Sequence, residues 1–162
     1  MARDDERLAQ IESVYRRDFR RFLHVAIAVT GERERAFDAV QDGFANAIKS
    51  RSAFRGETAI GGWLWRCVVN AALESRRKLA PERSAAEQLP TANGAPEEPM
   101  SGLRACIALL PERQRLAIFL RYYADLDYRS IGDALGIETG TVSATLSAAH
   151  AALRRSLEGV ET

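Results

Sequence analysis

A proline-rich segment divides this sequence and limits how the chain can fold. Residues 80–99 read APERSAAEQLPTANGAPEEP and contain four of the chain's five prolines but few large apolar side chains. Such a segment buries too little apolar surface to offset the entropy lost on ordering it, so we expect a flexible, acidic linker over 80–100. The flanking parts, 1–79 and 101–162, are each long enough for a small domain. The sequence therefore predicts two domains rather than one continuous unit.

Both flanking parts show the pattern of amphipathic helices. Apolar residues recur at spacings of three and four, Ala, Leu, Arg and Glu are plentiful, and runs of β-branched residues are scarce. Before the linker this pattern predicts a long helix that ends at Thr30-Gly31, and a second helix over about 33–50. It then predicts a loop over 52–62 and a third helix from about Trp63 to the basic run at 76–78. We therefore expect an all-α fold.

The part after the linker carries the signals of a helix-turn-helix. A short helix follows the linker, and Pro111 is expected as the first residue of the next helix. Asp127 can cap a helix over about 128–135, Gly136 suits a left-handed turn, and Thr139 can cap the last helix. The residues expected to interlock the two helices are Ile131, Leu135, Ile137, Val142 and Leu146.

Charge is distributed unevenly, although the net charge is only +1. Residues 1–79 carry 15 Lys/Arg against 11 Asp/Glu, residues 80–100 carry 1 against 4, and residues 101–162 carry 7 against 7. The basic excess, which is the part of the chain suited to nucleic acid, is confined to the first half.

Several functional classes are disfavoured. The two cysteines lie in apolar helical patterns and are expected to be buried thiols, with redox sensing as the alternative. With only two histidines there is no zinc-ligand spacing, so we expect no metal and no cofactor. No phosphate-binding glycine motif or nucleophile–base pair suggests an enzyme. No apolar stretch approaches the roughly 20 residues of a membrane span, and the acidic N-terminus is unlike a signal peptide, so a cytoplasmic protein is expected.

Five segments resemble a known family in their order and spacing. They read DAVQDGFANAI (38–48), FRGET (54–58), WLWRCVVN (63–70), LPERQRLAIFLRYY (110–123) and YRSIGDALGIETGTV (128–142). These segments resemble regions 2 and 4 of the extracytoplasmic-function (ECF, group 4) sigma factors of the sigma-70 family. The resemblance implies a region 2 bundle at 1–79 and a region 4 helix-turn-helix at 101–162. It also implies a bacterial protein that binds RNA polymerase core, melts promoter DNA and initiates transcription.

The resemblance also assigns residues to the polymerase. The helix around Asp38 is similar to the segment that docks on the polymerase clamp, and a helix of the second domain is similar to one that engages the flap. The residues expected at these contacts are Asp38, Gln41, Asp42, Phe44, Leu116 and Leu120. Asp38, Gln41 and Asp42 share one helix face by spacing, which also suits an ordinary exposed polar face.

A second set of residues is expected at minus-ten DNA. By resemblance, Phe54, Arg55, Trp63 and Asn70 line or adjoin the pocket for an extruded base. Opening DNA without ATP requires tighter binding of single strands, for which aromatic stacking supplies about 1–3 kcal/mol per base and cations hold phosphates. An amide can both donate to and accept from a base edge. The full set is Phe54, Arg55, Trp63, Arg66, Asn70, Arg76 and Arg77; the alternative is that the tryptophans are core and the arginines solvated surface.

The helix expected to read minus-thirty-five DNA departs from the family pattern. Family members usually carry Lys or Arg at several positions of this helix. This chain has no Lys or Arg from Ser130 to Leu153, and it has acidic residues at Asp133 and Glu138. The residues left to contact DNA are Arg129, Thr139, Thr141, Ser143, Thr145, Ser147 and Arg154. Because phosphate neutralisation supplies most non-specific affinity, we expect weak binding by this domain, or placement by polymerase, an activator or another partner.

Two further interpretations remain open. The uncharged reading helix is compatible with a decoy that binds an anti-sigma factor or polymerase without initiating transcription. Phe37 stands where the family often has an acid, and it marks either an altered partner surface or a core position.

Overall fold

The computed structural model describes residues 1–79 and 99–160, and within them all regular secondary structure is helical, with no strand. This confirms the predicted all-α class. The N-terminal half contains α1 (Ala2–Thr30), α2 (Arg33–Lys49), the short 3-10 helix η1 (Arg51–Ala53) and α3 (Ile60–Leu79). The C-terminal half contains α4 (Pro99–Ala108), α5 (Glu112–Tyr122), α6 (Tyr128–Leu135) and α7 (Thr139–Val160). The predicted linker falls almost wholly on residues 80–98, outside the described residues.

Helices α1, α2 and α3 form a three-helix bundle around a cluster of aromatic rings. Phe22 stacks on Trp65 with ring centroids 4.0 Å apart, and Phe44 meets Phe22 edge to face at 5.0 Å. Trp65 is only 3% exposed, so this tryptophan is a core residue, as its alternative interpretation held. Offset and edge-to-face pairs of this kind add to the apolar burial that holds a bundle together.

Gly43 brings α2 and α3 unusually close together. A Cβ on Gly43 would lie 2.7 Å from the Cα of Val68 and 3.0 Å from its backbone nitrogen. No side chain fits in that space, so the crossing of α2 and α3 depends on glycine at this position.

Several predicted helix ends differ from the structure. α1 ends as expected at Gly31, whose φ of 79° is left-handed. α3 starts at Ile60 rather than at Trp63, because the first helical turn tolerates Gly61 and Gly62, and α6 packs on that turn. Pro111 precedes α5 as its N-cap instead of opening it, and Thr139 is the first residue of α7 rather than its cap.

The helix-turn-helix forms as the turn signals predict. The Asp127 carboxylate accepts a hydrogen bond from the Ser130 backbone N–H at 2.8 Å, and Gly136 ends α6 with φ 68°. Ile131, Val142 and Leu146 are buried between α6 and α7, and Leu135 and Ile137 pack at the edge of this core. The cap and the left-handed glycine therefore set the angle at which α7 leaves the turn.

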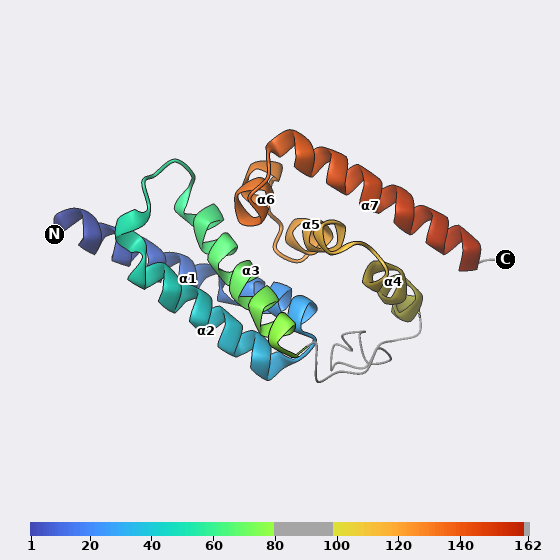
Figure 1. Cartoon of the computed structure of the whole chain (residues 1–162), viewed down its shortest axis with the longest axis horizontal. Coiled ribbons are helices and arrows are strands. Elements are labelled where there is room, and N and C mark those ends of the chain that lie inside the picture. The colour runs from blue at the N-terminus through green and yellow to red at the C-terminus, as the bar shows by residue number, and fades with distance from the viewer. Residues whose placement is uncertain (80–98, 161–162) are drawn as a thin grey trace.

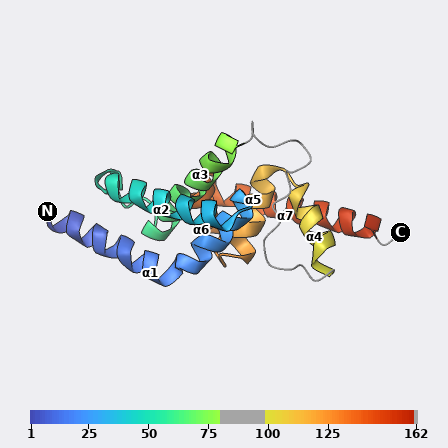
Figure 2. The same cartoon turned by 90° about the horizontal axis from the view of Figure 1, so that it is seen from below.

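The two halves are in direct contact. α6 packs against α3 and α5 touches α1, and the buried apolar residues of both halves form one cluster. Figure 1 shows α6 beside the upper part of α3, with α7 running across the top of the C-terminal half toward the C-terminus. In Figure 2, α4 and the C-terminal end of α7 lie on the side of the molecule away from the N-terminus.

Candidate functional site

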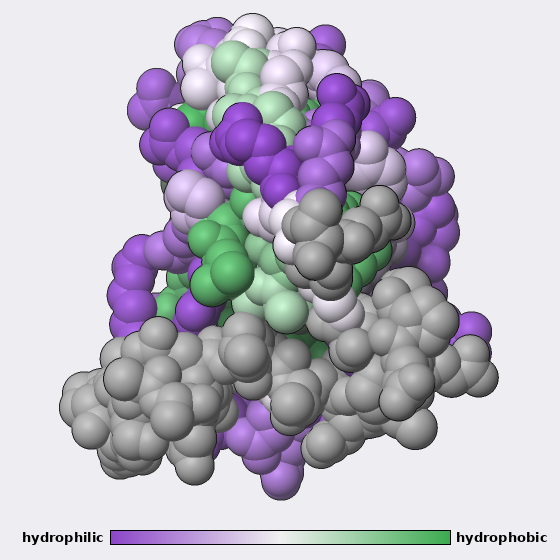
Figure 3. Space-filling model, turned by 90° about the vertical axis from the view of Figure 1, so that its right-hand side faces the viewer, coloured by the Kyte–Doolittle hydropathy of each residue, from purple (hydrophilic) through white to green (hydrophobic). Residues whose placement is uncertain are grey.

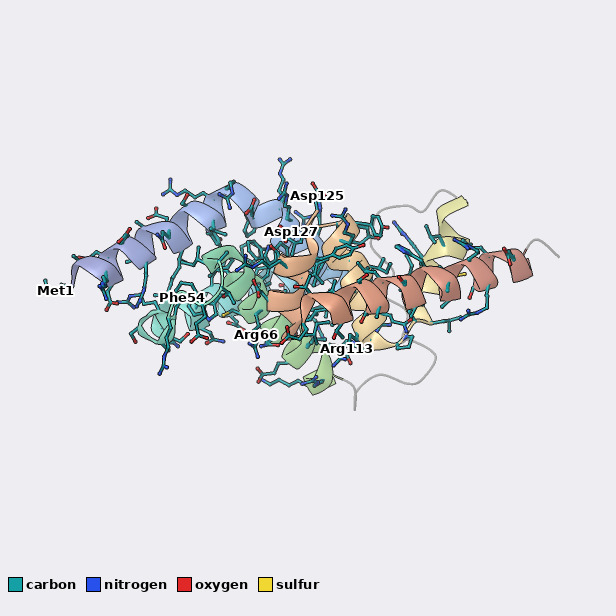
Figure 4. The ribbon with its side chains drawn as sticks, turned by 90° about the horizontal axis from the view of Figure 1, so that it is seen from above. Met1, Phe54, Arg66, Arg113, Asp125 and Asp127 are labelled. Carbon is teal, nitrogen blue, oxygen red and sulfur yellow. The ribbon has the colours of Figure 1, made fainter. Side chains whose placement is uncertain are left out.

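The residues expected at minus-ten DNA gather around the first turns of α3. Phe54, in the loop before α3, stacks on Trp63 with centroids 5.0 Å apart and an interplanar angle of 29°. Arg66 and Asn70 follow Trp63 at helical spacing and are exposed, as is Arg55 in the loop. Figure 4 shows Phe54 and Arg66 on the same side of the molecule. The structure therefore brings an aromatic pair, a cation and an amide onto one surface.

The basic residues at the end of α3 differ from each other in exposure. Arg77 is exposed, but Arg76 is partly buried and lies close enough to Arg115 of α5 to affect the pKa of Arg115. Burial, and then repulsion from Arg76, lower the pKa of Arg115, whose guanidinium also donates to the Ala108 carbonyl at 3.0 Å. A cation of each half of the molecule thus lies near a cation of the other half.

The residues expected at the polymerase clamp divide into surface and core. Asp38 and Asp42 are exposed on α2, and the Gln41 side chain donates to the Tyr15 hydroxyl at 2.7 Å. Phe44 is only 4% exposed, so its assignment as a contact residue is corrected: its ring packs against Phe22 inside the bundle.

The structure distinguishes between the two interpretations of Phe37, a surface residue or a core residue. Its side chain is 45% exposed, and its ring meets Phe19 edge to face at 5.8 Å. Phe37 is therefore a surface aromatic residue next to Asp38, and not a core residue.

The two leucines assigned to the polymerase flap need the same correction. Leu116 and Leu120 are buried in the core of the C-terminal half, so they hold α5 in place and cannot contact a partner in this structure. The large apolar side chains exposed in the described part of the C-terminal half are Leu109, Tyr122, Tyr123, Tyr128 and Leu157. Between α4 and α7 lies a shallow apolar pocket of about 460 Å³, lined in part by Leu103 and Leu157. Figure 3 shows hydrophobic surface among hydrophilic residues on this side of the molecule.

The residues expected at minus-thirty-five DNA lie mostly on the surface. Thr139, Thr141, Ser143 and Ser147 of α7 are exposed, as are Arg129 on α6 and Arg154 toward the end of α7. Thr145 is half-buried, and its hydroxyl donates to the Thr141 carbonyl at 2.7 Å. His150 is exposed and pairs with the Tyr122 hydroxyl at 2.8 Å. The first turns of α7 thus offer small hydroxyls and no cation.

A cleft between the two halves joins residues that the sequence does not connect. It has a volume of about 500 Å³ and is lined by Trp63 and Arg66 from α3, Arg113 from α5, and Asp133 and Glu138 from the helix-turn-helix. Figure 4 shows Arg66 and Arg113 on the same side of α7. Arg113, Asp133 and Glu138 were not assigned to a site from sequence, because no local pattern predicts a contact between distant segments.

Neither cysteine has the surroundings of a reactive thiol. Cys106 is buried and Cys67 is half-buried, and burial raises the pKa of the Cys67 thiol. Across residues 1–79 and 99–160 there is no group of three His, Cys, Asp or Glu side chains that could hold a metal ion. None of the helices described in this part of the chain is long and apolar enough to cross a membrane.

Comparison with known proteins identifies the family. Residues 14–82 match Sigma-70 region 2, and residues 101–153 match Sigma-70, region 4. The ECF RNA polymerase sigma factor SigM of Mycobacterium tuberculosis is 31% identical over 93% of this chain and 79% of its own. The chain belongs to the ECF sigma-70 family. The RNA polymerase sigma factor YlaC of Bacillus subtilis is also similar, with 27% identity over 91% of each chain.

Two solved structures share the fold. CnrH, solved with the cytosolic domain of CnrY, superimposes with a TM-score of 0.69 at 19% identity, covering 92% of this chain and 88% of its own. The sigma factor RpoE of Bartonella quintana, solved with the anti-sigma factor NepR, gives 0.60 at 21% identity and 95% coverage of each. As a family member the chain functions as a sigma factor, which binds RNA polymerase and initiates transcription, and the decoy interpretation is not favoured.

Proposed function

We propose that this sigma factor opens promoters with the surface formed by Phe54, Trp63, Arg66 and Asn70. The stacked pair Phe54–Trp63 carries the proposal, because it places an aromatic platform at the start of α3, with the exposed Arg66 and Asn70 about one and two turns further along the same helix. Aromatic faces bind unstacked bases regardless of sequence, while the amide reads a base edge. Arg55 and the basic end of α3, Arg76 and Arg77, extend this surface along the phosphates.

The proposed contact with polymerase core is the face of α2 that carries Asp38 and Asp42. Phe37 adds an exposed aromatic ring to this acidic face. Aromatic residues are enriched at the energetic centres of interfaces, whereas charges at the rim mainly set orientation and rate. We therefore assign Phe37 to the clamp contact, with the buried Phe44 supporting the helix from beneath.

Region 4 (101–162) is proposed to give little unaided affinity for minus-thirty-five DNA. The exposed residues Thr139, Thr141, Ser143 and Ser147 lack the bidentate donors that Arg presents to guanine, and the nearest cations, Arg129 and Arg154, lie outside the reading turns. Polymerase flap, an activator or an anti-sigma partner then positions this region. Domain boundaries at 1–79 and 101–162, a cytoplasmic location and a non-enzymatic role complete the proposal.

The test is run-off transcription with RNA polymerase core on a promoter library presented as duplex and as pre-melted templates. Trp63→Ala should lower transcript yield on duplex templates by about 5- to 150-fold, because it removes a stacking contact to an unpaired base worth about 1–3 kcal/mol. Asn70→Ala should also lower the yield, because it removes a contact to a base edge. Pre-melted templates should recover part of the yield for Trp63→Ala. Arg20→Ala, which removes an exposed cation of α1, is the matched control.

Two results would contradict this proposal. Equal losses for Trp63→Ala on duplex and pre-melted templates would place its role outside melting. Binding to core with no transcript from the unaltered chain on any template would instead support the decoy interpretation.

A further inference from the structure

Helix α6 of region 4 lies directly over the first turn of α3 in region 2. A Cβ on Gly62 would fall 2.7 Å from the Cβ of Asp133 and 2.8 Å from its Oδ2 atom. Only glycine leaves room for this approach. One residue earlier, a Cβ on Gly61 would meet no atom within 4 Å. The contact is therefore specific to one face of the α3 start.

The contact is also electrostatically complementary. The first turn of α3 contains no acidic side chain of its own, although the free N–H groups and the dipole of a helix start favour negative charge. The carboxylate of Asp133 lies against that turn and supplies this charge from the other half of the molecule. The start of a helix next to an arginine is equally suited to a phosphate group. Asp133 thus occupies space that a DNA phosphate would need beside Arg66 and Trp63, which line the same cleft.

This arrangement cannot bind both promoter elements. Minus-ten and minus-thirty-five elements are separated by about 25 base pairs, or about 85 Å at 3.4 Å per base pair. A reading helix must also enter a major groove about 8.5 Å deep with its N-terminal residues. Here Thr141, near the start of α7, lines the cleft together with Trp63. Region 4 must leave region 2 before the two regions can occupy their elements.

We propose that region 4 is an intramolecular inhibitor of region 2, in which α6 docks on the start of α3 and Asp133 takes the place of a DNA phosphate. The inference rests on the proposed function, because it takes Trp63 and Arg66 as DNA-binding residues. This proposal also explains why the helix-turn-helix, which lacks Lys and Arg from Ser130 to Leu153, has an acidic residue at Asp133. The Asp133 side chain makes the contact with α3.

The closed contact is built to be reversible. Arg76 of α3 lies near enough to Arg115 of α5 for the two guanidinium groups to repel each other, which opposes the attraction at the Asp133 end. Arg66 is exposed but shares its cleft with Asp133, so the complete surface proposed for DNA is available only once α6 leaves α3. Polymerase or DNA can therefore shift the molecule to an open state by binding that state alone.

The test compares two ways of weakening the contact in the full chain. Gly62→Ala forces the Asp133 side chain away from α3, and Gly61→Ala is its matched control, with the same change one residue away. Asp133→Asn removes the charge while keeping the shape, and Glu158→Gln removes one acid from the far end of α7. Circular dichroism checks helix content. Small-angle scattering measures the radius of gyration, about 15 Å for a compact chain of this length. A fluorescein-labelled 12-nucleotide single strand of random sequence measures DNA affinity.

Gly62→Ala should raise the radius of gyration by several Å and tighten single-strand binding about tenfold, the ratio expected where about a tenth of the unaltered molecules are open. Asp133→Asn should change both quantities in the same direction, while Gly61→Ala and Glu158→Gln stay within about twofold of the unaltered chain.

The inference is overturned if the unaltered chain is already extended. It is also overturned if Gly62→Ala and Asp133→Asn stay compact with unchanged affinity, or if they open without binding DNA more tightly than the unaltered chain. Absence of single-strand binding by every variant, including one shown to be open, would overturn the proposed function of region 2 as well.

Discussion

Gly43 is the position at which a single methyl group should most damage region 2. Its α-carbon faces the backbone of α3, with the position of an added Cβ 2.7 Å from the Val68 Cα and 2.9 Å from its Cγ2. A flexible side chain could turn away from such a clash, but a backbone atom cannot. Gly43→Ala therefore requires α2 and α3 to move apart, and with them the acidic clamp face and the DNA face.

The size of the effect follows from two opposing contributions. Overpacking of a tight core costs about 1–3 kcal/mol, and a clash with backbone belongs at the upper end of that range. Replacing Gly with Ala inside a helix returns about 0.8–1 kcal/mol. The net loss in the free energy of unfolding should be about 1–2 kcal/mol, or about 2–8 °C in Tm for a chain of this size.

Thermal and urea unfolding, followed by circular dichroism at 222 nm, measure this loss. Gly102→Ala in α4 is the matched control, because a Cβ there meets no atom within 4 Å and the change should leave Tm equal or higher. If Gly43→Ala unfolds at or above the temperature of the unaltered chain, the close crossing of α2 and α3 does not need glycine, and the reasoning fails.

Two further predictions concern the helix-turn-helix. The Ser130 backbone N–H bonded to the Asp127 carboxylate lowers the pKa of Asp127, so the folded state favours the ionised cap. Asp127→Ala should cost about 1 kcal/mol at neutral pH. Its deficit should shrink as pH falls through the lowered pKa, which urea titrations at neutral and acidic pH can measure. Ser143→Lys places a cation on the exposed face of α7 and should steepen the slope of log affinity against log salt for duplex DNA by about 1. An unchanged slope in anisotropy titrations would mean that this face does not meet phosphates.

Local signals in the sequence were enough to predict most of the helices. Asp127 and Gly136 act through bonds to near neighbours, so their roles follow from residue type and spacing alone. The sequence pattern predicts a start of α3 at Trp63, which is too late, because two glycines usually indicate a loop. In the structure they form the first helical turn, where α6 comes closest.

The candidate site was harder to predict where apolar residues were involved. Periodicity shows that Phe44, Leu116 and Leu120 lie on an apolar face, but a face that meets a partner and a face that meets the core look the same in sequence. Their burial is decided by the helices that pack on them. Phe37 is the opposite case: it is an aromatic residue next to the apolar face of α2, yet its side chain is exposed on the surface.

The neutral reading helix and the acid on α6 have separate physical consequences. The absence of Lys and Arg from the first turns of α7 lowers the attraction of region 4 for phosphates, which appears as a shallow salt dependence. Asp133 instead stabilises the closed molecule, which appears as compactness and as a reduced fraction of competent chains. A cation added at Ser143 should therefore change the salt dependence without opening the molecule, whereas loss of the Asp133 charge should open it. The weak promoter binding that we propose for this sigma factor then has two independent causes, only one of which polymerase can relieve by separating the two regions.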